Sequence, residues 1–317
     1  MVRLLAMKKT ILALGSLLPP EMKRLESDFN VLKLWKMEDP EAELQAQKNN
    51  IVGILSTAGG MGVTRRMIES LPNLELIAQH GVGVDNIDLE AAKDRHVMVT
   101  NTPDVLTNDT ADTAMALILA VLRRVVEADV NVRAGNWRIP LGASLTGKKV
   151  GIIGLGRIGA SIAKRCEAFE MTIFYHGRHE KKDSSYRYFS DLEKMAQESD
   201  ILVAACPGGE ETFHLVNYKI LKALGPSGYL INIARGSVVD TEDLLIALSN
   251  KDIAGAGLDV YEKEPEVPDA LKSMDNVVLL PHIGSATTET RTKMGELVLN
   301  NINAHFEGKA LITPVKI

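Results

Sequence analysis

Short apolar runs alternate with amphipathic stretches along the first hundred residues of the chain. The apolar runs predict buried strands, and the stretches between them place apolar residues at helical spacing. This alternation is typical of a mostly parallel sheet with helices on both faces. The predicted strands are Ile11–Leu14, Val31–Leu34, Ile51–Leu55, Leu74–Ala78 and Val97–Thr100, and the predicted helices lie near residues 21–27, 41–47, 64–70 and 88–93.

A second set of strands follows a long stretch that is predicted to be helical, from about Asn108 to Ala134. A last predicted helix, from about Thr287 to Glu307, is long enough to cross back to the first half. We therefore expect an α/β protein with two doubly wound parallel-sheet domains (Rossmann- or flavodoxin-like) and an intervening cleft. The expected domains are residues 1–106 plus 286–317, which bind substrate, and residues 107–285, which bind the cofactor. The second set of predicted strands is Val150–Gly154, Thr172–Tyr175, Ile201–Ala205, Leu230–Ile233, Gly255–Val260 and Val277–Leu280.

Composition narrows the class of protein. The chain has 317 residues, of which 45% are hydrophobic and 24% charged, which suits about two soluble domains. A net charge of −5 does not fit a nucleic-acid-binding protein, and the apolar run Ala114–Leu122 is too short to span a bilayer. Cys166 and Cys206 lie far apart without metal-site spacing, so we expect no metal and a reduced, cytoplasmic setting. Residues 1–7 are interpreted as a loose extension.

A glycine-rich segment follows the predicted strand at Val150. Gly154, Gly156 and Gly159 form G-x-G-x-x-G between this strand and an amphipathic helix, which is the context that dinucleotide binding requires. The first glycine permits a tight turn, the second lets the backbone approach a pyrophosphate, and the third lets the helix pack closely. The helix N-terminus offers free N–H groups to the phosphates. The residues expected at the cofactor are Gly154, Leu155, Gly156, Arg157, Ile158 and Gly159.

The next strand ends in a cationic turn. An NAD site would carry an acidic residue there for the ribose 2′-hydroxyl, but this chain has Gly177, Arg178 and His179, followed by two lysines. A carboxylate would repel a 2′-phosphate, whereas the planar guanidinium of Arg178 binds one well. The turn therefore favours NADP(H), with NAD(H) possible but less preferred; the alternative is a solvated basic turn.

Three residues of the second half predict the chemistry of 2-keto acid reduction. Arg235, Glu264 and His282 each follow a predicted strand, at the sheet edge where ligands bind in such folds. Hydride transfer to a carbonyl carbon needs a cation to hold the substrate carboxylate and a proton donor for the oxygen. Arginine and histidine suit these tasks, and a carboxylate on the far ring nitrogen would fix the histidine tautomer and favour the imidazolium. Taken singly, each residue is more often structural or solvated; His80, before the Gly81 loop, is the one rival histidine.

In combination, these motifs resemble the D-2-hydroxyacid dehydrogenase family and, within it, the glyoxylate/hydroxypyruvate reductases. The resemblance covers nearly the whole chain and is weakest over the first fifty residues. The motifs that carry it are Gly81–Asp88, Thr102–Ala111, Val150–Gly159, Asn232–Gly236, Gly257–Pro265 and Pro281–Ala286.

The resemblance implies roles for particular residues. Arg235, Glu264 and His282 take the family's catalytic positions, and the backbone of Val82 and Gly83 binds the substrate carboxylate, as an anion nest of amides would. The family is usually dimeric through the cofactor domain, here from Asn108 to about Thr146, and Trp137 matches a region near the partner's active site. Further implied cofactor contacts are Thr110, Cys206, Pro207, Ile233, Ala234, Asp259 near the nicotinamide carboxamide, and Gly284.

The function expected from the sequence is NADPH-dependent reduction of glyoxylate or hydroxypyruvate, with His282 as proton donor. A nucleotide-sensing corepressor of the same fold is an alternative, although such proteins usually carry extra tails that this chain lacks. A dehydrogenase of another small anion, formate or phosphite, is a third possibility.

Overall fold

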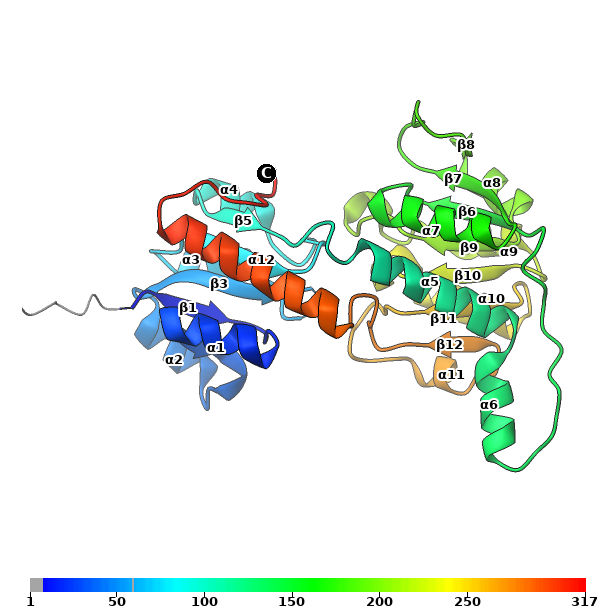
Figure 1. Ribbon diagram of the computed structural model, residues 1–317, viewed down its shortest axis with the longest axis horizontal. Coiled ribbons are helices and arrows are strands. Elements are labelled where there is room, and N and C mark those ends of the chain that lie inside the picture. The colour runs from blue at the N-terminus through cyan, green and yellow to red at the C-terminus, as the bar shows by residue number, and fades with distance from the viewer. Residues whose placement is uncertain (1–7, 59) are drawn as a thin grey trace, which may run out of the picture. The chain divides into compact units, whose positions relative to one another are not determined.

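The computed structural model describes residues 8–58 and 60–317, which form two compact units (Figure 1). The interpretation of residues 1–7 as an extension lies outside the described residues. Unit 1 comprises the chain up to Leu106 together with Ala286–Ile317, and unit 2 comprises Thr107–Ser285. None of the described helices is both long and apolar enough to cross a membrane.

Unit 1 is a five-stranded parallel sheet in the order β2-β1-β3-β4-β5, the flavodoxin-like order. Apolar side chains fill both faces of this sheet, as the near-continuous apolar strands require. Its elements are β1 (Thr10–Ala13), α1 (Pro19–Asp28), β2 (Asn30–Lys33), η1 (Leu34–Lys36), α2 (Pro40–Gln47), β3 (Ile51–Thr57), α3 (Arg65–Ser70), β4 (Leu76–His80), α4 (Leu89–Asp94), β5 (Met98–Thr100) and α12 (Thr288–Phe306).

Unit 2 is a seven-stranded parallel sheet in the order β12-β11-β10-β9-β6-β7-β8, which contains the Rossmann order. Two apolar clusters cover its faces, one of them under α5 and α7. The prediction of two doubly wound α/β domains is thus confirmed. Its elements are α5 (Thr107–Leu122), α6 (Val125–Arg133), β6 (Lys149–Ile153), α7 (Arg157–Ala168), β7 (Thr172–His176), β8 (Arg187–Phe189), α8 (Leu192–Glu198), β9 (Ile201–Ala204), η2 (Glu210–Thr212), α9 (Tyr218–Leu224), β10 (Tyr229–Asn232), η3 (Gly236–Val238), α10 (Thr241–Ser249), β11 (Gly255–Leu258), α11 (Asp269–Lys272) and β12 (Val277–Leu279).

The predicted helical stretch from about Asn108 to Ala134 is present as two helices, α5 and α6. Arg124 adopts a left-handed conformation with φ of 53°, which ends α5 at Leu122 and lets α6 start in a new direction. The side chain of Arg124 pairs with Glu127 in the first turn of α6. The short edge strand β8 is a second feature that the apolar pattern did not predict.

The C-terminal helix α12 packs over β4 of unit 1. Val298, Leu299 and Ile302 of this helix contact the same apolar cluster as Leu76 and Ala78. The first turn of α12 begins at the cap Thr287, whose hydroxyl accepts a hydrogen bond from the backbone N–H of Thr290. Side chains on this face of β4 are therefore sealed from solvent.

His80 at the end of β4 is one of these sealed side chains. It is 4% exposed, and neither ring nitrogen has a hydrogen-bond partner among the described residues. Burial, reinforced by the nearby Arg291 guanidinium, lowers the pKa of His80 from 6.5 to about 4. The ring is therefore neutral near pH 7, and its charged form is excluded from the core.

We predict that this histidine makes unit 1 sensitive to acid. As the pH falls from 6.5 towards 4, the unfolded chain takes up a proton on His80 before the folded chain does, so the free energy of unfolding falls. The loss should reach roughly 3 kcal/mol. Denaturant unfolding across this pH interval measures it. His80→Leu should remove this part of the pH dependence, and His96→Asn, at an exposed histidine, should keep it. Equal slopes in wild type and His80→Leu would contradict the assignment.

Candidate active site

Three adjacent strands of unit 2 end beside one another and carry the three predicted catalytic residues. Strands β10, β11 and β12 are parallel neighbours, so their carboxyl ends share one edge of the sheet. Arg235 follows β10, Glu264 lies in the loop after β11, and His282 follows β12. The structure thus brings together residues that lie up to 47 positions apart in the sequence (282 − 235).

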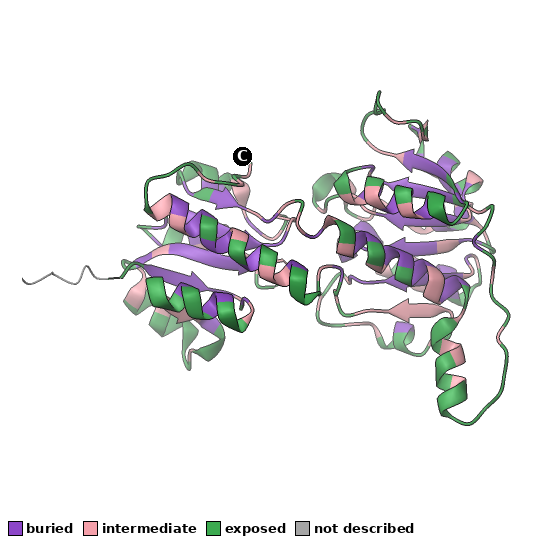
Figure 2. Cartoon of the chain, in the orientation of Figure 1, coloured by how far each residue is buried: buried purple, intermediate pink, exposed green. Residues whose placement is uncertain are grey.

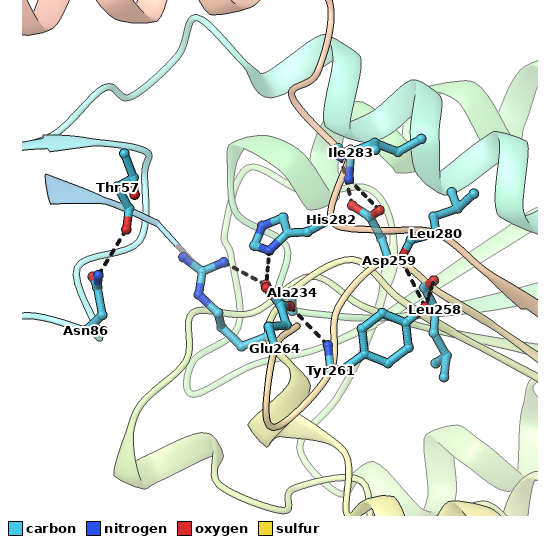
Figure 3. A network of polar contacts seen from close by, with 12 residues as sticks. Thr57, Asn86, Ala234, Leu258, Asp259, Tyr261, Glu264, Leu280, His282 and Ile283 are labelled. Atoms are coloured by element: carbon cyan, nitrogen blue, oxygen red, sulfur yellow. Dashed lines mark hydrogen bonds and ion pairs between the residues drawn. The ribbon is translucent and has the colours of Figure 1, made fainter. Parts of the chain in front are cut away.

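His282 and Glu264 form a direct hydrogen bond (Figure 3). Nδ1 of the ring lies 2.7 Å from Oε2 of Glu264, and both side chains are largely enclosed, with 28% and 18% exposed. Burial acts to raise the pKa of Glu264, but the bond from His282 and the nearby charge of Arg235 lower it below the usual value. The ionised carboxylate accepts from Nδ1, so Nε2 is the ring nitrogen left for other chemistry.

The second oxygen of Glu264 is also held. The backbone N–H of Tyr261 donates to Oε1 at 3.1 Å, which fixes the carboxylate within its own loop. The hydroxyl of Tyr261 donates to the carbonyl of Leu280 at 3.0 Å, two residues before His282. Burial, with the neighbouring acids Asp259 and Glu264, raises the pKa of Tyr261 to about 12, so the hydroxyl remains a donor at neutral pH. Tyr261 therefore connects the loops that carry the two residues of the pair, a function that sequence reasoning did not predict.

Asp259 holds the turn that contains His282. This carboxylate is 2% exposed and accepts the N–H groups of Ile283 at 2.7 Å and Gly284 at 2.8 Å. Burial raises its pKa, although these two amide donors oppose the shift. His282 itself has φ of 57°, a strained backbone conformation that this pair of bonds helps to hold. The role of Asp259 near a nicotinamide carboxamide stays a prediction.

Arg235 stands on a loop that is shaped by Asn232. The buried amide of Asn232 donates to the carbonyl of Arg235 at 2.9 Å and accepts the N–H of Ala234 at 3.1 Å. The guanidinium in turn donates to the carbonyl of Ala234 at 2.8 Å. In the sequence, Asn232 stands out only as the first residue of the motif Asn232–Gly236. Its two hydrogen bonds show why an amide side chain is needed where this strand ends.

The dinucleotide-type turn lies on the same edge of unit 2. Gly154 has φ of 95°, and a side chain there would meet the backbone of Cys206 at 2.7 Å. A side chain at Gly159 would lie 2.1 Å from the carbonyl oxygen of Gly154, so only glycine lets α7 pack this closely. At Gly156, the N-cap of α7, a Cβ would meet nothing within 4 Å, which leaves room for a ligand at the helix N-terminus. These features fit a bound pyrophosphate.

The cationic turn follows β7 directly. The hydroxyl of Tyr188 donates to the carbonyl of Gly177 at 3.0 Å, and Tyr175 accepts the N–H of Lys181 at 2.8 Å, so aromatic side chains shape the turn. Arg178 projects into solvent with 79% of its side chain exposed and pairs with Glu211 at 3.1 Å. The geometry fits recognition of an exposed phosphate group.

The remaining residues predicted to contact cofactor all belong to unit 2. Thr110 of α5 lies beside Gly284. A Cβ added at Gly284 would lie 3.4 Å from the methyl carbon of Thr110. Arg157 and Ile158 lie in the first turn of α7. The others occupy the loops that follow strands: Leu155 after β6, His179 after β7, Cys206 and Pro207 after β9, and Ile233 and Ala234 after β10.

In the predicted substrate loop of unit 1, the backbone carbonyls of Val82 and Gly83 both accept hydrogen bonds from side chains. Asn101 donates to the carbonyl of Val82 at 2.8 Å, and Gln79 donates to that of Gly83 at 2.9 Å. A side chain at Gly81, with φ of 156°, would lie 2.5 Å from the Cβ of Ala58. Two amide side chains that sequence reasoning missed therefore fix this backbone.

Within residues 8–58 and 60–317, no cluster of three or more His, Cys, Asp or Glu side chains could hold a metal ion.

Comparisons with known proteins agree on one family. Residues 115–284 match the model of the NAD binding domain of D-isomer specific 2-hydroxyacid dehydrogenases. A glyoxylate/hydroxypyruvate reductase A of Arabidopsis thaliana is 49% identical over 294 residues, covering 92% of this chain and 94% of that protein. A hydroxyphenylpyruvate reductase of Plectranthus scutellarioides is 46% identical over 296 residues, with the same coverage. The crystal structure of an NADPH-dependent glyoxylate/hydroxypyruvate reductase from Sinorhizobium meliloti, in complex with NADP and malonate, matches with a TM-score of 0.89, 41% identity and 97% coverage of both chains.

Close packing at Gly236 generates a prediction about the loop of Glu264. A Cβ at Gly236 would lie 1.9 Å from the carbonyl carbon of Tyr261 and 2.2 Å from the nitrogen of Glu262, and backbone cannot yield as a side chain can. Gly236→Ala should lower the free energy of unfolding by about 1–3 kcal/mol in denaturant titrations. Gly177→Ala, where a Cβ meets nothing within 4 Å, is the matched control and should change it by less than about 0.5 kcal/mol. Equal stability of the two variants would refute the steric reading.

Proposed function

Because the chain belongs to the D-isomer specific 2-hydroxyacid dehydrogenase family, we propose that it is an NADPH-dependent reductase of small 2-keto acids such as glyoxylate and hydroxypyruvate. The product is the D-2-hydroxy acid. The observation that carries the proposal is the hydrogen bond between His282 and Glu264 at the sheet edge that also bears the glycine turn and Arg235.

In the proposed reaction, a bound reduced nicotinamide supplies hydride to C2 of the keto acid. His282 donates the balancing proton from Nε2 to the carbonyl oxygen, because Nδ1 is held by Glu264. The ionised Glu264 fixes the tautomer and stabilises the imidazolium before that transfer. Arg235 holds the substrate carboxylate and polarises the carbonyl. The reaction consumes one keto acid, one NADPH and one proton.

The remaining residues hold the two ligands. The amides at the start of α7, between Gly154 and Gly159, bind the pyrophosphate, and Arg178 binds the 2′-phosphate. The backbone N–H groups of Val82 and Gly83 in unit 1 bind the substrate carboxylate. The cleft expected between the two units stays a prediction.

Both cysteines are free, which supports a reducing compartment, and we place the enzyme in the cytoplasm on that ground.

A substrate panel with NADPH and NADH in parallel tests the proposal. We expect NADPH oxidation with glyoxylate and hydroxypyruvate, and faster turnover with NADPH than with NADH. Hydroxyphenylpyruvate tests whether the site also admits an aromatic keto acid. Formate and phosphite, offered with NADP, test the alternative of small-anion oxidation. No turnover with any keto acid would overturn the proposal and reopen the binding-protein alternative.

The proton donor is tested by His282→Ala. This variant should lose about 10²- to 10⁴-fold in kcat, since it lacks the general acid, and should still bind NADPH. His305→Ala is the matched control because it breaks another histidine–carboxylate pair, with Glu75 at 3.2 Å, on α12 of unit 1. The control should keep wild-type turnover. Retention of more than about a tenth of kcat in His282→Ala would exclude histidine as the donor.

We also propose that the enzyme is a homodimer through the segment from Asn108 to about Thr146, which places Trp137 near the partner's active site. Support comes from the number of large apolar side chains that are exposed on α6 and the loop that follows it, segments that are largely exposed (Figure 2). Exposed apolar side chains that gather in one segment are typical of an interface with another protein chain. The large apolar side chains that are at least half exposed in this segment are Val125, Val126, Val130, Val132, Trp137, Ile139 and Leu141.

Light scattering after gel filtration tests the dimer. We expect twice the 34.5 kDa mass of one chain at micromolar concentration. Leu141→Asp should lower the mass towards that of one chain, because a carboxylate in an apolar interface is costly. Ile312→Asp, at an exposed residue of unit 1, should not. A wild-type protein with the mass of one chain would contradict the proposal.

A further inference from the structure

An ion pair joins two loops of unit 2 on either side of the dinucleotide-type turn. Arg178 follows β7 and Glu211 lies in η2 after β9, and these two strands flank β6 in the sheet. Oε2 of Glu211 lies 3.1 Å from Nη1 of Arg178, with both side chains more than 70% exposed. The pair therefore connects the loops beside the strand that leads into Gly154.

The loop that presents Glu211 is well anchored. The hydroxyl of Thr212 donates to the carbonyl of Pro207 at 2.8 Å, and its backbone N–H donates to Gly209 at 3.1 Å, which closes the η2 turn. Two positions further on, the ring of His214 lies between Asp240 at 2.9 Å and Glu262 at 2.6 Å. The carboxylate of Glu211 thus extends from a fixed backbone, and its approach to Arg178 follows from the placement of the loop.

This contact changes the electrostatics of the proposed phosphate site. The strand end at β7 lacks the acidic residue of NAD sites, but Glu211 supplies a carboxylate from another loop. A carboxylate and a phosphate bind guanidinium through the same N–H groups, so they compete for Arg178. A cofactor without a 2′-phosphate has no group that competes with Glu211 for the guanidinium of Arg178.

We propose that Glu211 is a specificity-determining residue that occupies Arg178 until a 2′-phosphate displaces it. It thereby weakens NADPH binding and leaves NADH binding almost unchanged, which narrows the preference between the two cofactors. This inference rests on the proposed role of Arg178 in the NADPH-dependent reductase. Its neighbour Glu210 shares the same η2 turn but forms no ion pair among the described residues, and so provides a matched control.

The test measures binding of 2′,5′-ADP and 5′-AMP, which differ by the 2′-phosphate and require no turnover. In calorimetric titrations at low salt, Glu211→Gln should tighten 2′,5′-ADP binding about two- to fivefold, the range of an exposed ion pair, and leave 5′-AMP binding unchanged. Glu210→Gln should alter neither. High salt should shrink the gain, because the competing charges are exposed.

Arg178→Gln separates competition from simple repulsion. In that background the further change Glu211→Gln should give no gain in 2′,5′-ADP affinity, since the contested guanidinium is gone. A gain that persists there, an equal gain in Glu210→Gln, or no gain in Glu211→Gln would each overturn the inference. Steady-state KM values for NADPH and NADH check the consequence for catalysis. Keto-acid turnover without these binding effects would remove this inference alone, and the binding effects without turnover would remove the proposed reaction alone.

Discussion

The hydrogen bond between His282 and Glu264 is the contact on which the proposed chemistry depends. A histidine beside a largely enclosed, ionised carboxylate has one defined tautomer and one nitrogen left for proton transfer. Enclosing a carboxylate is costly unless its oxygens are bonded, and here both are, one by the ring and the other by the N–H of Tyr261. The surrounding loops have to keep this arrangement fixed.

Several neighbours fix it at once. Asp259 accepts hydrogen bonds from the two amides after His282. The hydroxyl of Tyr261 donates to the carbonyl of Leu280. Because Gly236 has no side chain, the loop of Arg235 packs directly against the backbone of the loop that carries Glu264. Each contact joins loops that follow different strands of one parallel sheet. Parallel strands deliver all their carboxyl ends to the same edge, so three short loops suffice to assemble the catalytic group beside the glycine turn.

Much of this organisation could be predicted from local sequence. The alternation of apolar runs and helical stretches indicated two doubly wound sheets, and residues placed just after strands indicated Arg235, Glu264 and His282. The helical stretch predicted from about Asn108 to Ala134 is divided into two helices, because Arg124 takes up a left-handed conformation that periodicity does not encode. The bonds of Tyr261, Asn232 and Asp259 were missed for another reason: each depends on which loop lies opposite, and their side chains look ordinary in the sequence. Glu211 is similar, since its partner Arg178 lies 33 residues away.

The most direct test of the central claim is a single-turnover measurement on Glu264→Gln. Enzyme with bound NADPH is mixed with glyoxylate, and the decay of NADPH absorbance gives the rate of reduction. Loss of the carboxylate should slow that step at least about tenfold, because the ring is no longer oriented and charged for proton transfer, while NADPH affinity stays unchanged. A variant that reduces glyoxylate at the wild-type rate would show that the histidine–carboxylate pair is not the proton-donating unit.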